Sequence, residues 1–374
     1  MRLPFGPSPP FRALGVLGSV GASLILAFSG ASLAVASPDV DPLSNDHGIV
    51  VDGPEPPKIW AKSWIVADAE TGEVLAAKNA HQRLRPASTL KTLTAVTLLP
   101  KLDLNDGYRV QWEDAHATGS AVGIVPGSRY TIDELFYGLM LPSGNDAARA
   151  LASAAGGLHR TVRAMNTEAD ALGAQDTHAI NPTGLDAPGQ FTSAFDLAIF
   201  TRAGLTNRDF RRYVSTVSTS FPAQEPKRDK RRDTYMIYNQ NPLLLEGYRG
   251  ILGVKTGYTS QAGRTFVAAV RRGDRTLIVA LMGIVEPSET AAKRLFTWGF
   301  SQGDNVTAVG TLNEPNSVTH PDHETTVTTP PPQAAGVSTS TPDTGDSPAQ
   351  GFAVWVLAGI ALVGGGWWLQ RRRT

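Results

Sequence analysis

The sequence predicts a mixed α/β fold of the α+β kind, with one antiparallel sheet flanked by helices and a helical lobe beside it. Two observations lead to this prediction. Strand–turn–strand patterns occur near residues 63–78 and again near residues 264–283. Apolar residues recur with helical spacing in the long stretch between them. Strands from both ends of the domain are therefore expected to share one sheet, while the middle forms the lobe.

The two predicted hairpins share one signature, a pair of apolar segments joined by a short turn. In the first, "SWIVAD" and "EVLAAK" flank Glu70, Thr71 and Gly72. In the second, "RTFVAAV" and "TLIVALMG" flank "RRGD", and the strand-like "GVKTGYT" comes directly before them. Segments of this kind around glycine-containing turns are typical of antiparallel hairpins.

The segments expected to be helical carry a start signal or one apolar face. "TIDELFYGLML" begins at Thr131 and has Glu134 three residues later, which together form a capping box. "NDAARALASAA" and "GLHRTVRAMNTEADALG" are expected to form further helices of the lobe. "SETAAKRLFTWGF" has the spacing of an amphipathic helix and should close the domain.

The N-terminal residues have the features of an export signal. Two arginines precede a long apolar run that ends in the triplet "AVA", so residues 1–36 are predicted to be a secretory signal peptide. An uncleaved membrane anchor is the alternative, because the apolar run is long for a signal peptide. Residues 37–57 are rich in Pro, Asp and Gly and are expected to form a short leader.

The body of the protein is expected to span residues 58–312, followed by three further segments. Residues 313–350 are dominated by Thr, Pro and Ser, which predicts a linker. Residues 352–369 are apolar and long enough to cross a bilayer, and the arginines in residues 370–374 favour a cytoplasmic tail. We therefore expect a single-pass membrane protein with an extracytoplasmic domain.

Two features near the C-terminus have alternative interpretations. The apolar segment could be a buried core helix, although its three glycines, paired tryptophans and arginine cluster favour a membrane span. The "TPDTG" before it resembles a sortase anchoring signal but lacks the leucine with which such signals usually begin. The basic run "KRDKRRD" is interpreted as a solvated loop rather than a contact with wall polymer or lipid.

The composition excludes several classes of function. The formal net charge is zero, so no global basic field argues for a nucleic-acid partner. The chain has no cysteine, which excludes a disulfide framework, a thiolate metal site and a cysteine nucleophile. It also has no H-E-x-x-H, no G-x-S-x-G and no Walker loop. We therefore expect no metal and no organic cofactor.

The stretch "RPASTLKTLTAV" places Ser88 and Lys91 three residues apart at the start of a predicted helix. Such residues share a helix face, so both side chains would point into the same space. A lysine with a lowered pKa can activate a serine where no histidine is available. An ordinary capped helix with an exposed lysine is the alternative, since serine is a common helix cap.

Two downstream motifs favour the nucleophile. Ser143-Gly144-Asn145 is the only S-x-N in the chain, and the later "KTG" at 255–257 is the only K-T-G. S-x-x-K, followed by a serine–asparagine motif and K-T-G, is the constellation of penicillin-binding proteins and class A β-lactamases. Three single-copy motifs in this order indicate a serine acyl-transfer enzyme.

With "NPTGLDAPGQFTSAFDLA" and "NQNPLLL", these motifs make residues 59–283 resemble the serine-type D-alanyl-D-alanine carboxypeptidases, which are low-molecular-mass penicillin-binding proteins. The resemblance implies a β-lactamase/transpeptidase-like fold and a peptidoglycan stem peptide ending in D-Ala-D-Ala as substrate. It also implies that β-lactam antibiotics are covalent inhibitors. Ser88 would be the nucleophile and Lys91 its base, Ser143 would relay a proton to the leaving amine, and Asn145 would hold the substrate amide.

The same resemblance implies the roles of the residues around the K-T-G. Lys255 and Thr256 would bind the terminal carboxylate of the substrate. The backbone N–H groups of Ser88 and Tyr258 would form the oxyanion hole. On physical grounds, Lys255 near Lys91 would lower the pKa of that base, and Gly257 would let a peptide backbone approach the strand.

Two rival functions use the same residues. A serine β-lactamase would need a further base for deacylation, and the class A pattern E-x-x-x-N does not occur in the chain. A penicillin-binding sensor or scaffold without hydrolytic activity is the second rival, but it would have no use for an activated nucleophile.

Overall fold

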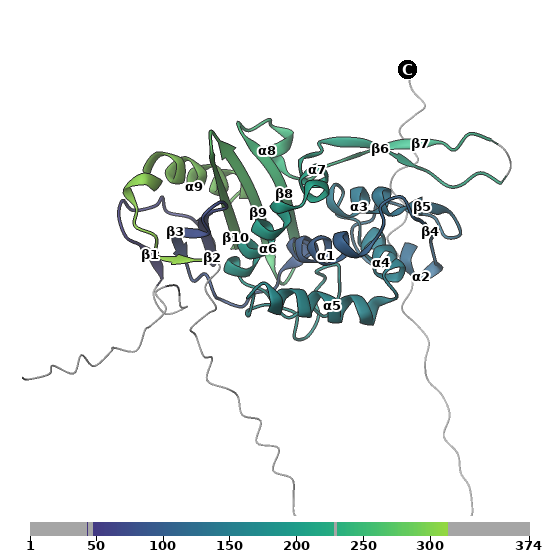
Figure 1. The fold of residues 1–374 in the computed structure, drawn as a ribbon, viewed down its shortest axis with the longest axis horizontal. Coiled ribbons are helices and arrows are strands. Elements are labelled where there is room, and N and C mark those ends of the chain that lie inside the picture. Colours follow the sequence, from purple (N-terminus) through teal and green to yellow (C-terminus); the bar gives the residue numbers. More distant parts are fainter. Residues whose placement is uncertain (1–42, 44–47, 228–229, 313–374) are drawn as a thin grey trace, which may run out of the picture. The chain divides into compact units, whose positions relative to one another are not determined.

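The structure, a computed structural model, describes Leu43 and residues 48–227 and 230–312 (Figure 1). The predicted signal peptide at 1–36, the linker at 313–350, the membrane span at 352–369 and the basic tail all lie outside these residues. Within the described ranges, no helix combines the length and apolar character that a membrane crossing requires.

One antiparallel sheet of seven strands organises the domain. Its order is β1-β3-β2-β10-β9-β8, with β11 also paired to β3. Strands from both ends of the domain therefore share the sheet, as predicted, and both predicted hairpins are confirmed. The strands are β1 (Ile49–Val51), β2 (Ser63–Asp68), β3 (Glu73–Lys78), β8 (Ile251–Thr259), β9 (Gly263–Arg272), β10 (Arg275–Ile284) and β11 (Gly310–Thr311).

Helices and two small hairpins make up the rest of the described chain (Figure 1). The α-helices are α1 (Lys91–Leu98), α2 (Trp112–Ala115), α3 (Ile132–Met140), α4 (Asn145–Ala154), α5 (Leu158–Ala171), α6 (Ala194–Thr206), α7 (Arg208–Ser215), α8 (Pro242–Leu245) and α9 (Ser288–Gln302). The 3-10 helices are η1 (Ala87–Leu90), η2 (Leu99–Lys101) and η3 (Gly303–Asn305). The small hairpins pair β4 (Gly107–Arg109) with β5 (Arg129–Thr131), and β6 (Ser218–Pro222) with β7 (Thr234–Tyr238).

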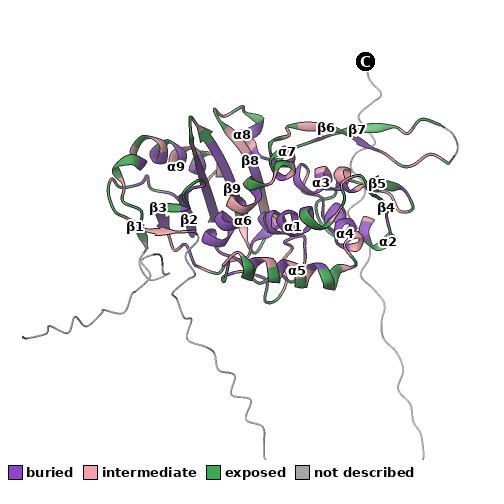
Figure 2. Ribbon diagram, in the orientation of Figure 1, coloured by how far each residue is buried: buried purple, intermediate pink, exposed green. Residues whose placement is uncertain are grey.

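The sheet is buried on both faces, which explains why its central strands are continuous apolar runs (Figure 2). Neighbouring side chains on a strand point to opposite faces. Trp64 accordingly joins the core beneath α9, while Ile65 joins the core shared with the lobe helices. The sheet is thus a central layer, with α9 on one face and helices such as α1 and α6 on the other.

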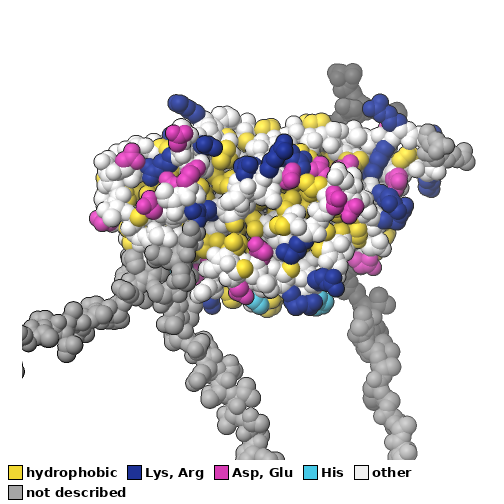
Figure 3. Space-filling model, viewed as in Figure 1, with side chains coloured by type: hydrophobic (Ala, Val, Ile, Leu, Met, Phe, Trp, Pro, Cys, Tyr) yellow, Lys and Arg dark blue, Asp and Glu magenta, His cyan; other side chains and the backbone are white. Residues whose placement is uncertain are grey.

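The lobe helices match the predicted segments closely. The capping box is present, because the Thr131 hydroxyl accepts from the Glu134 N–H at 3.1 Å and the Glu134 carboxylate accepts from the Thr131 N–H at 2.8 Å. The helices α6 and α7 and the β6–β7 hairpin were not predicted. On the face of the protein seen in Figure 3, basic and acidic side chains are interspersed, in keeping with the zero net charge.

The predicted leader needs a correction in the part that the structure describes. Residues 49–51 form β1, which pairs with β3, and Asp52 bridges to Thr307. The sheet therefore begins before residue 58. A strand of three residues next to Pro, Asp and Gly gives too short an apolar pattern to be predicted from the sequence.

Candidate active site

The first motif forms a compact turn against the sheet. Ser88 lies in η1, and Lys91 is the first residue of α1. The Lys91 Nζ is 3.0 Å from the Ser88 Oγ. No side chain caps either helix, and Lys91 is completely buried, so the alternative of a capped helix with an exposed lysine is wrong.

The amine of Lys91 has two more partners. Its Nζ donates to the Asn145 Oδ1 at 2.6 Å and to the Thr183 carbonyl at 2.7 Å. A neutral amine has two N–H groups and one lone pair. With both N–H groups engaged by these acceptors, the lone pair is left for the hydroxyl of Ser88, which is the arrangement a general base needs.

Both motif lysines lose a proton more easily than an ordinary lysine. The pKa of Lys91 is well below its ordinary value, first because of burial and second because of the positive charge of Lys255, while Asp146 acts in the opposite direction. Burial lowers the pKa of Lys255 to about 7. The positive charge of Lys255 therefore favours the neutral, basic form of Lys91, and Lys255 itself keeps that charge below about pH 7.

The strand β8 lies directly against the nucleophile turn. A Cβ on Gly257 would be 2.8 Å from the Ser88 nitrogen and 2.4 Å from the Thr265 Oγ1, so a larger residue would force the strand away. The Thr265 hydroxyl on β9 also donates to the Pro86 carbonyl at 2.8 Å. The sheet therefore fixes both the strand and the start of the turn that carries the serine.

The remaining K-T-G residues lie along the same strand. The Lys255 Nζ donates to the Thr256 carbonyl at 2.8 Å. Lys255 is buried, Thr256 is half-buried, and Tyr258 is 69% exposed. The predicted anchor for a carboxylate and the predicted oxyanion donor are thus brought to the edge strand beside Ser88, with Tyr258 at the rim.

The second motif lies on the lobe side. Ser143 has a φ of 65° in the left-handed region, is buried, and its hydroxyl has no hydrogen-bond partner among the described residues. Asn145 begins α4, and its Nδ2 donates to the Thr118 carbonyl at 2.7 Å while its Oδ1 accepts from Lys91. The structure therefore brings Ser88, Lys91 and Asn145 into direct contact.

Asp146 is a functional residue that sequence reasoning missed. Its carboxylate accepts from three successive backbone N–H groups, those of Val122, Gly123 and Ile124, at 2.9, 2.7 and 3.2 Å. It thereby fixes the loop that forms the wall of the site on the lobe side. Its position directly after the S-x-N motif was the available signal.

A second missed group shapes the floor beneath Lys91. The Asn181 Oδ1 accepts from the Thr183 N–H at 3.1 Å and from the Gly184 N–H at 2.9 Å, which orients the Thr183 carbonyl toward Lys91. Gly184 has a φ of 82°, and a Cβ there would be 1.8 Å from the Ala87 carbonyl oxygen. These residues belong to the stretch "NPTG", which contributed to the family resemblance but was not assigned a role in the site.

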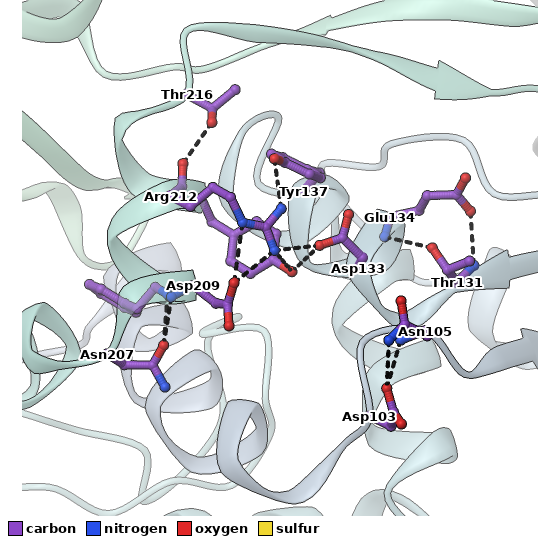
Figure 4. A network of polar contacts seen from close by, with 12 residues as sticks. Asp103, Asn105, Thr131, Asp133, Glu134, Tyr137, Asn207, Asp209, Arg212 and Thr216 are labelled. Carbon is purple, nitrogen blue, oxygen red and sulfur yellow. Dashed lines mark hydrogen bonds and ion pairs between the residues drawn. The ribbon is translucent and has the colours of Figure 1, made fainter.

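A polar network at the interface of α3 and α7 supports the lobe (Figure 4). Arg212 of α7 donates to the Asp133 carboxylate at 2.6 Å and to the Tyr137 hydroxyl at 2.9 Å, both on α3. It also pairs with Asp209 at 3.0 Å. Because α3 ends just before Ser143, this network helps to set the position of the Ser143 turn.

The described residues also contain a pocket away from the motifs but no cluster that could hold a metal ion. A shallow hollow over α9, lined in part by Pro54, Trp298 and Gln302, contains none of the motif residues. Within the described ranges, no group of three or more His, Asp or Glu side chains is placed to hold a metal ion. The motif geometry therefore locates the candidate active site.

Comparison with known proteins agrees with this geometry. Residues 51–285 match the family described as D-alanyl-D-alanine carboxypeptidase, peptidase S11. The carboxypeptidase DacB2 of Mycobacterium tuberculosis is 40% identical over 74% of this chain and 92% of its own length. The carboxypeptidase DacD of Escherichia coli is 34% identical over 71% of this chain and 69% of its own length.

Solved structures lead to the same fold. A D-alanyl-D-alanine carboxypeptidase from Mycobacterium tuberculosis superposes with a TM-score of 0.65 at 40% identity, covering 70% of this chain and 99% of that one. The Streptomyces K15 DD-transpeptidase gives a TM-score of 0.62 at 28% identity, covering 66% of this chain and 100% of that one. The penicillin-binding, transpeptidase-like α/β fold predicted from the sequence is thus confirmed. Because the family match contains all three motifs around Ser88, the chain belongs to the peptidase S11 family of serine-type D-alanyl-D-alanine carboxypeptidases.

Proposed function

We propose that this carboxypeptidase removes the terminal D-alanine from peptidoglycan stem peptides through an acyl-enzyme on Ser88. The observation that carries the proposal is the Lys91 Nζ at 3.0 Å from the Ser88 Oγ, in a buried site that lowers the pKa of the amine and so favours its neutral form. A neutral lysine in contact with a serine hydroxyl is an activated nucleophile.

In the acylation step, the Ser88 Oγ attacks the carbonyl of the penultimate D-alanine and Lys91 takes the hydroxyl proton. Negative charge then develops on the carbonyl oxygen. The backbone N–H groups of Ser88 and Tyr258 are the proposed donors to that oxygen. The close approach of Gly257 to the Ser88 nitrogen supports this, because it places the two backbones side by side.

In the next step, the peptide bond breaks and D-alanine leaves as the amine. Ser143 is the proposed relay that passes the proton from Lys91 to this nitrogen. Its buried hydroxyl has no other partner among the described residues, so it is available to bond to both groups. Asn145, already in contact with Lys91, would hold the substrate amide through its side chain. Water then hydrolyses the ester and restores Ser88.

The terminal carboxylate of the substrate is assigned to Lys255 and Thr256. Lys255 keeps its charge below about pH 7, and a buried cation is a strong partner for a carboxylate. β-Lactam antibiotics also carry a carboxylate beside a reactive amide. They are therefore proposed to acylate Ser88 as covalent inhibitors.

Export and membrane attachment are also proposed, from the sequence alone. The signal-like residues 1–36 and the apolar residues 352–369 support an extracytoplasmic domain held by a single C-terminal span, with a cytoplasmic tail. Deleting residues 352–374 should release active enzyme into the medium. Retention in the membrane fraction would point instead to an uncleaved N-terminal anchor.

The decisive experiment measures acylation and product release on the full chain. Mass spectrometry after penicillin treatment should show one adduct on Ser88, and a D-Ala-D-Ala peptide should release free D-alanine. Ser88→Ala should lose both, while Ser220→Ala, at an exposed serine of β6, should keep both. Rapid turnover of penicillin would favour a β-lactamase, and an adduct without D-alanine release would favour a sensor or scaffold.

A further inference from the structure

Three residues on one face of β8 form a row along the active site. Side chains alternate along a strand, so Lys255, Gly257 and Thr259 share a face. At a rise of about 3.4 Å per residue, Lys255 and Thr259 each lie roughly 7 Å from Gly257. Gly257 marks the position of Ser88, since its Cβ would touch the Ser88 nitrogen. The nucleophile therefore lies midway between the two ends of this row.

The end opposite Lys255 carries a negative charge. The Thr259 Oγ1 donates to the Asp186 Oδ1 at 3.0 Å, and Asp186 is half-buried. Asp186 makes no ion pair with any residue in the part of the chain that the structure describes. The nearby Arg85 donates instead to the Ala187 carbonyl at 3.1 Å. A partly desolvated carboxylate without a cationic partner favours a cation brought by a ligand.

The position of Asp186 is set by the same turn that serves Lys91. Gly184, two residues earlier, packs on the Ala87 carbonyl, and the Thr183 carbonyl accepts from Lys91. On the other side, Thr259 also accepts from the Ala262 N–H at 3.0 Å, which fixes its hydroxyl. Asp186 is thus held between the nucleophile turn and the end of β8.

We propose that Asp186 is a specificity-determining residue that binds an ammonium group on the substrate residue preceding the penultimate D-alanine. The inference rests on the proposed function, which assigns the substrate's terminal carboxylate to Lys255. With the scissile carbonyl at Ser88, the acyl part of the peptide must continue in the other direction, toward Thr259. The next residue then lies beside Asp186, and the site has a cation for one end of the ligand and an anion for the other.

The expected preference is modest because the carboxylate is only half-buried. A partly exposed ion pair gives roughly a two- to fivefold difference in catalytic efficiency. The preference should also shrink as ionic strength rises, because salt screens charges near the surface.

The test compares two peptides on the full-length enzyme. Both end in D-Ala-D-Ala and carry lysine before it, with a free ε-amine in one and an acetylated amine in the other. The wild type should favour the free amine by about two- to fivefold in kcat/KM. Asp186→Asn retains an acceptor for Thr259 but not the charge, and should make the two peptides equal. Asp274→Asn, at an exposed turn between β9 and β10, is the matched loss of charge and should keep the preference.

Several outcomes would overturn the inference. One is a wild type with no preference between the peptides, and another is an Asp186→Asn variant that loses activity on both while the ratio persists. Acylation by a penicillin with an uncharged side chain reports whether the variant folds. If it does not fold, a wild-type preference that is insensitive to salt would also contradict the proposal. Release of D-alanine from neither peptide would overturn the proposed substrate, and the inference with it.

Discussion

The two walls of the active site are built in different ways. On the sheet side, β8 is fixed by a backbone ladder to β9, and Lys255 and Gly257 follow from the strand register. On the lobe side, the Ser143 turn has a left-handed backbone, and side chains bind the main chain of this turn and of the neighbouring loop. Asp146 and Gln240 are two of these, the latter donating from its Nε2 to the Pro142 carbonyl at 3.0 Å.

This difference gives the two walls different roles: the sheet wall fixes the position of the nucleophile, and the lobe wall adjusts the alignment of the groups around it. The edge strand β8 is paired with β9 from Ile251 to Thr259, so it moves only with that neighbour and the sheet wall supplies a rigid reference for the nucleophile. The lobe wall is held by single hydrogen bonds, each of which contributes about 1 kcal/mol or somewhat more to stability. Substitutions in the sheet wall should therefore mainly change the rate of the chemical step. Substitutions in the lobe wall should change the free energy of unfolding and the alignment of the catalytic groups.

The largest effect is expected from Gly257→Ala on the sheet wall. The added methyl would be 2.8 Å from the Ser88 nitrogen, so β8 must shift away from the nucleophile. A displacement of about 1 Å can cost a hundredfold, and we expect a fall of this size in the rate of penicillin acylation. Gly107→Ala, where the nearest atom is at 3.9 Å and φ is not left-handed, is the control and should be neutral. Unchanged acylation in Gly257→Ala would mean that the sheet wall is not rigid.

Lys255→Ala should reduce catalytic efficiency by about tenfold to a hundredfold, since a charge-assisted contact contributes about 1.5–3 kcal/mol. Loss of this charge removes one cause of the low pKa of Lys91, so that pKa should rise. The neutral base then forms only at higher pH, and the acid limb of the pH–rate profile should move upward. A profile that does not move would contradict the electrostatic coupling of the two lysines.

Asp146→Asn on the lobe wall should have the opposite effect on the profile. Asp146 raises the pKa of Lys91, so removing its charge should lower that pKa and move the acid limb to lower pH. The amide also cannot accept from all the N–H groups that the carboxylate binds, and the free energy of unfolding should fall by roughly 3 kcal/mol. Chemical denaturation measures the second effect. A shift of the limb in the same direction as in Lys255→Ala would be inconsistent with this comparison.

The smallest effect is expected from Gln240→Glu. Gln240 is exposed, and glutamate has the same shape but cannot donate to the Pro142 carbonyl when ionised. We expect kcat to fall by about two- to fivefold with little change in KM, because one neutral hydrogen bond next to Ser143 is lost. The melting temperature should stay within a degree or two of the wild type. A larger change in KM than in kcat would place Gln240 in substrate binding instead.

The contrast between the walls also explains which parts of the fold and of the active site could be predicted from the sequence. The strands of the sheet wall have apolar runs bounded by turns, and the K-T-G lies within one of them, so both the element and the motif were predictable. The S-x-x-K and S-x-N motifs were visible as residues. The left-handed backbone of Ser143 was not predictable, since nothing in the side chain of a serine requires it.

Contacts between distant segments account for what was missed. The Asn181 side chain orients the carbonyl that Lys91 binds, and Gln240 reaches Pro142 across 98 positions of the chain. Such pairs leave no periodic pattern in a single sequence. The short α7 and the β6–β7 hairpin were missed for a similar reason, because the extended hairpin buries few apolar side chains of its own.

The placement of β1 and β11 has a mechanical consequence. Both pair with β3, and the strand order separates β1 from β8 by five strand spacings, or about 24 Å at about 4.8 Å each. A load applied where the chain enters the domain at Ile49, or leaves it at Thr311, would therefore act in shear on the ladders to β3. The catalytic strand lies at the unloaded edge. Reporter fusions or surface immobilisation through either terminus should consequently leave turnover unchanged.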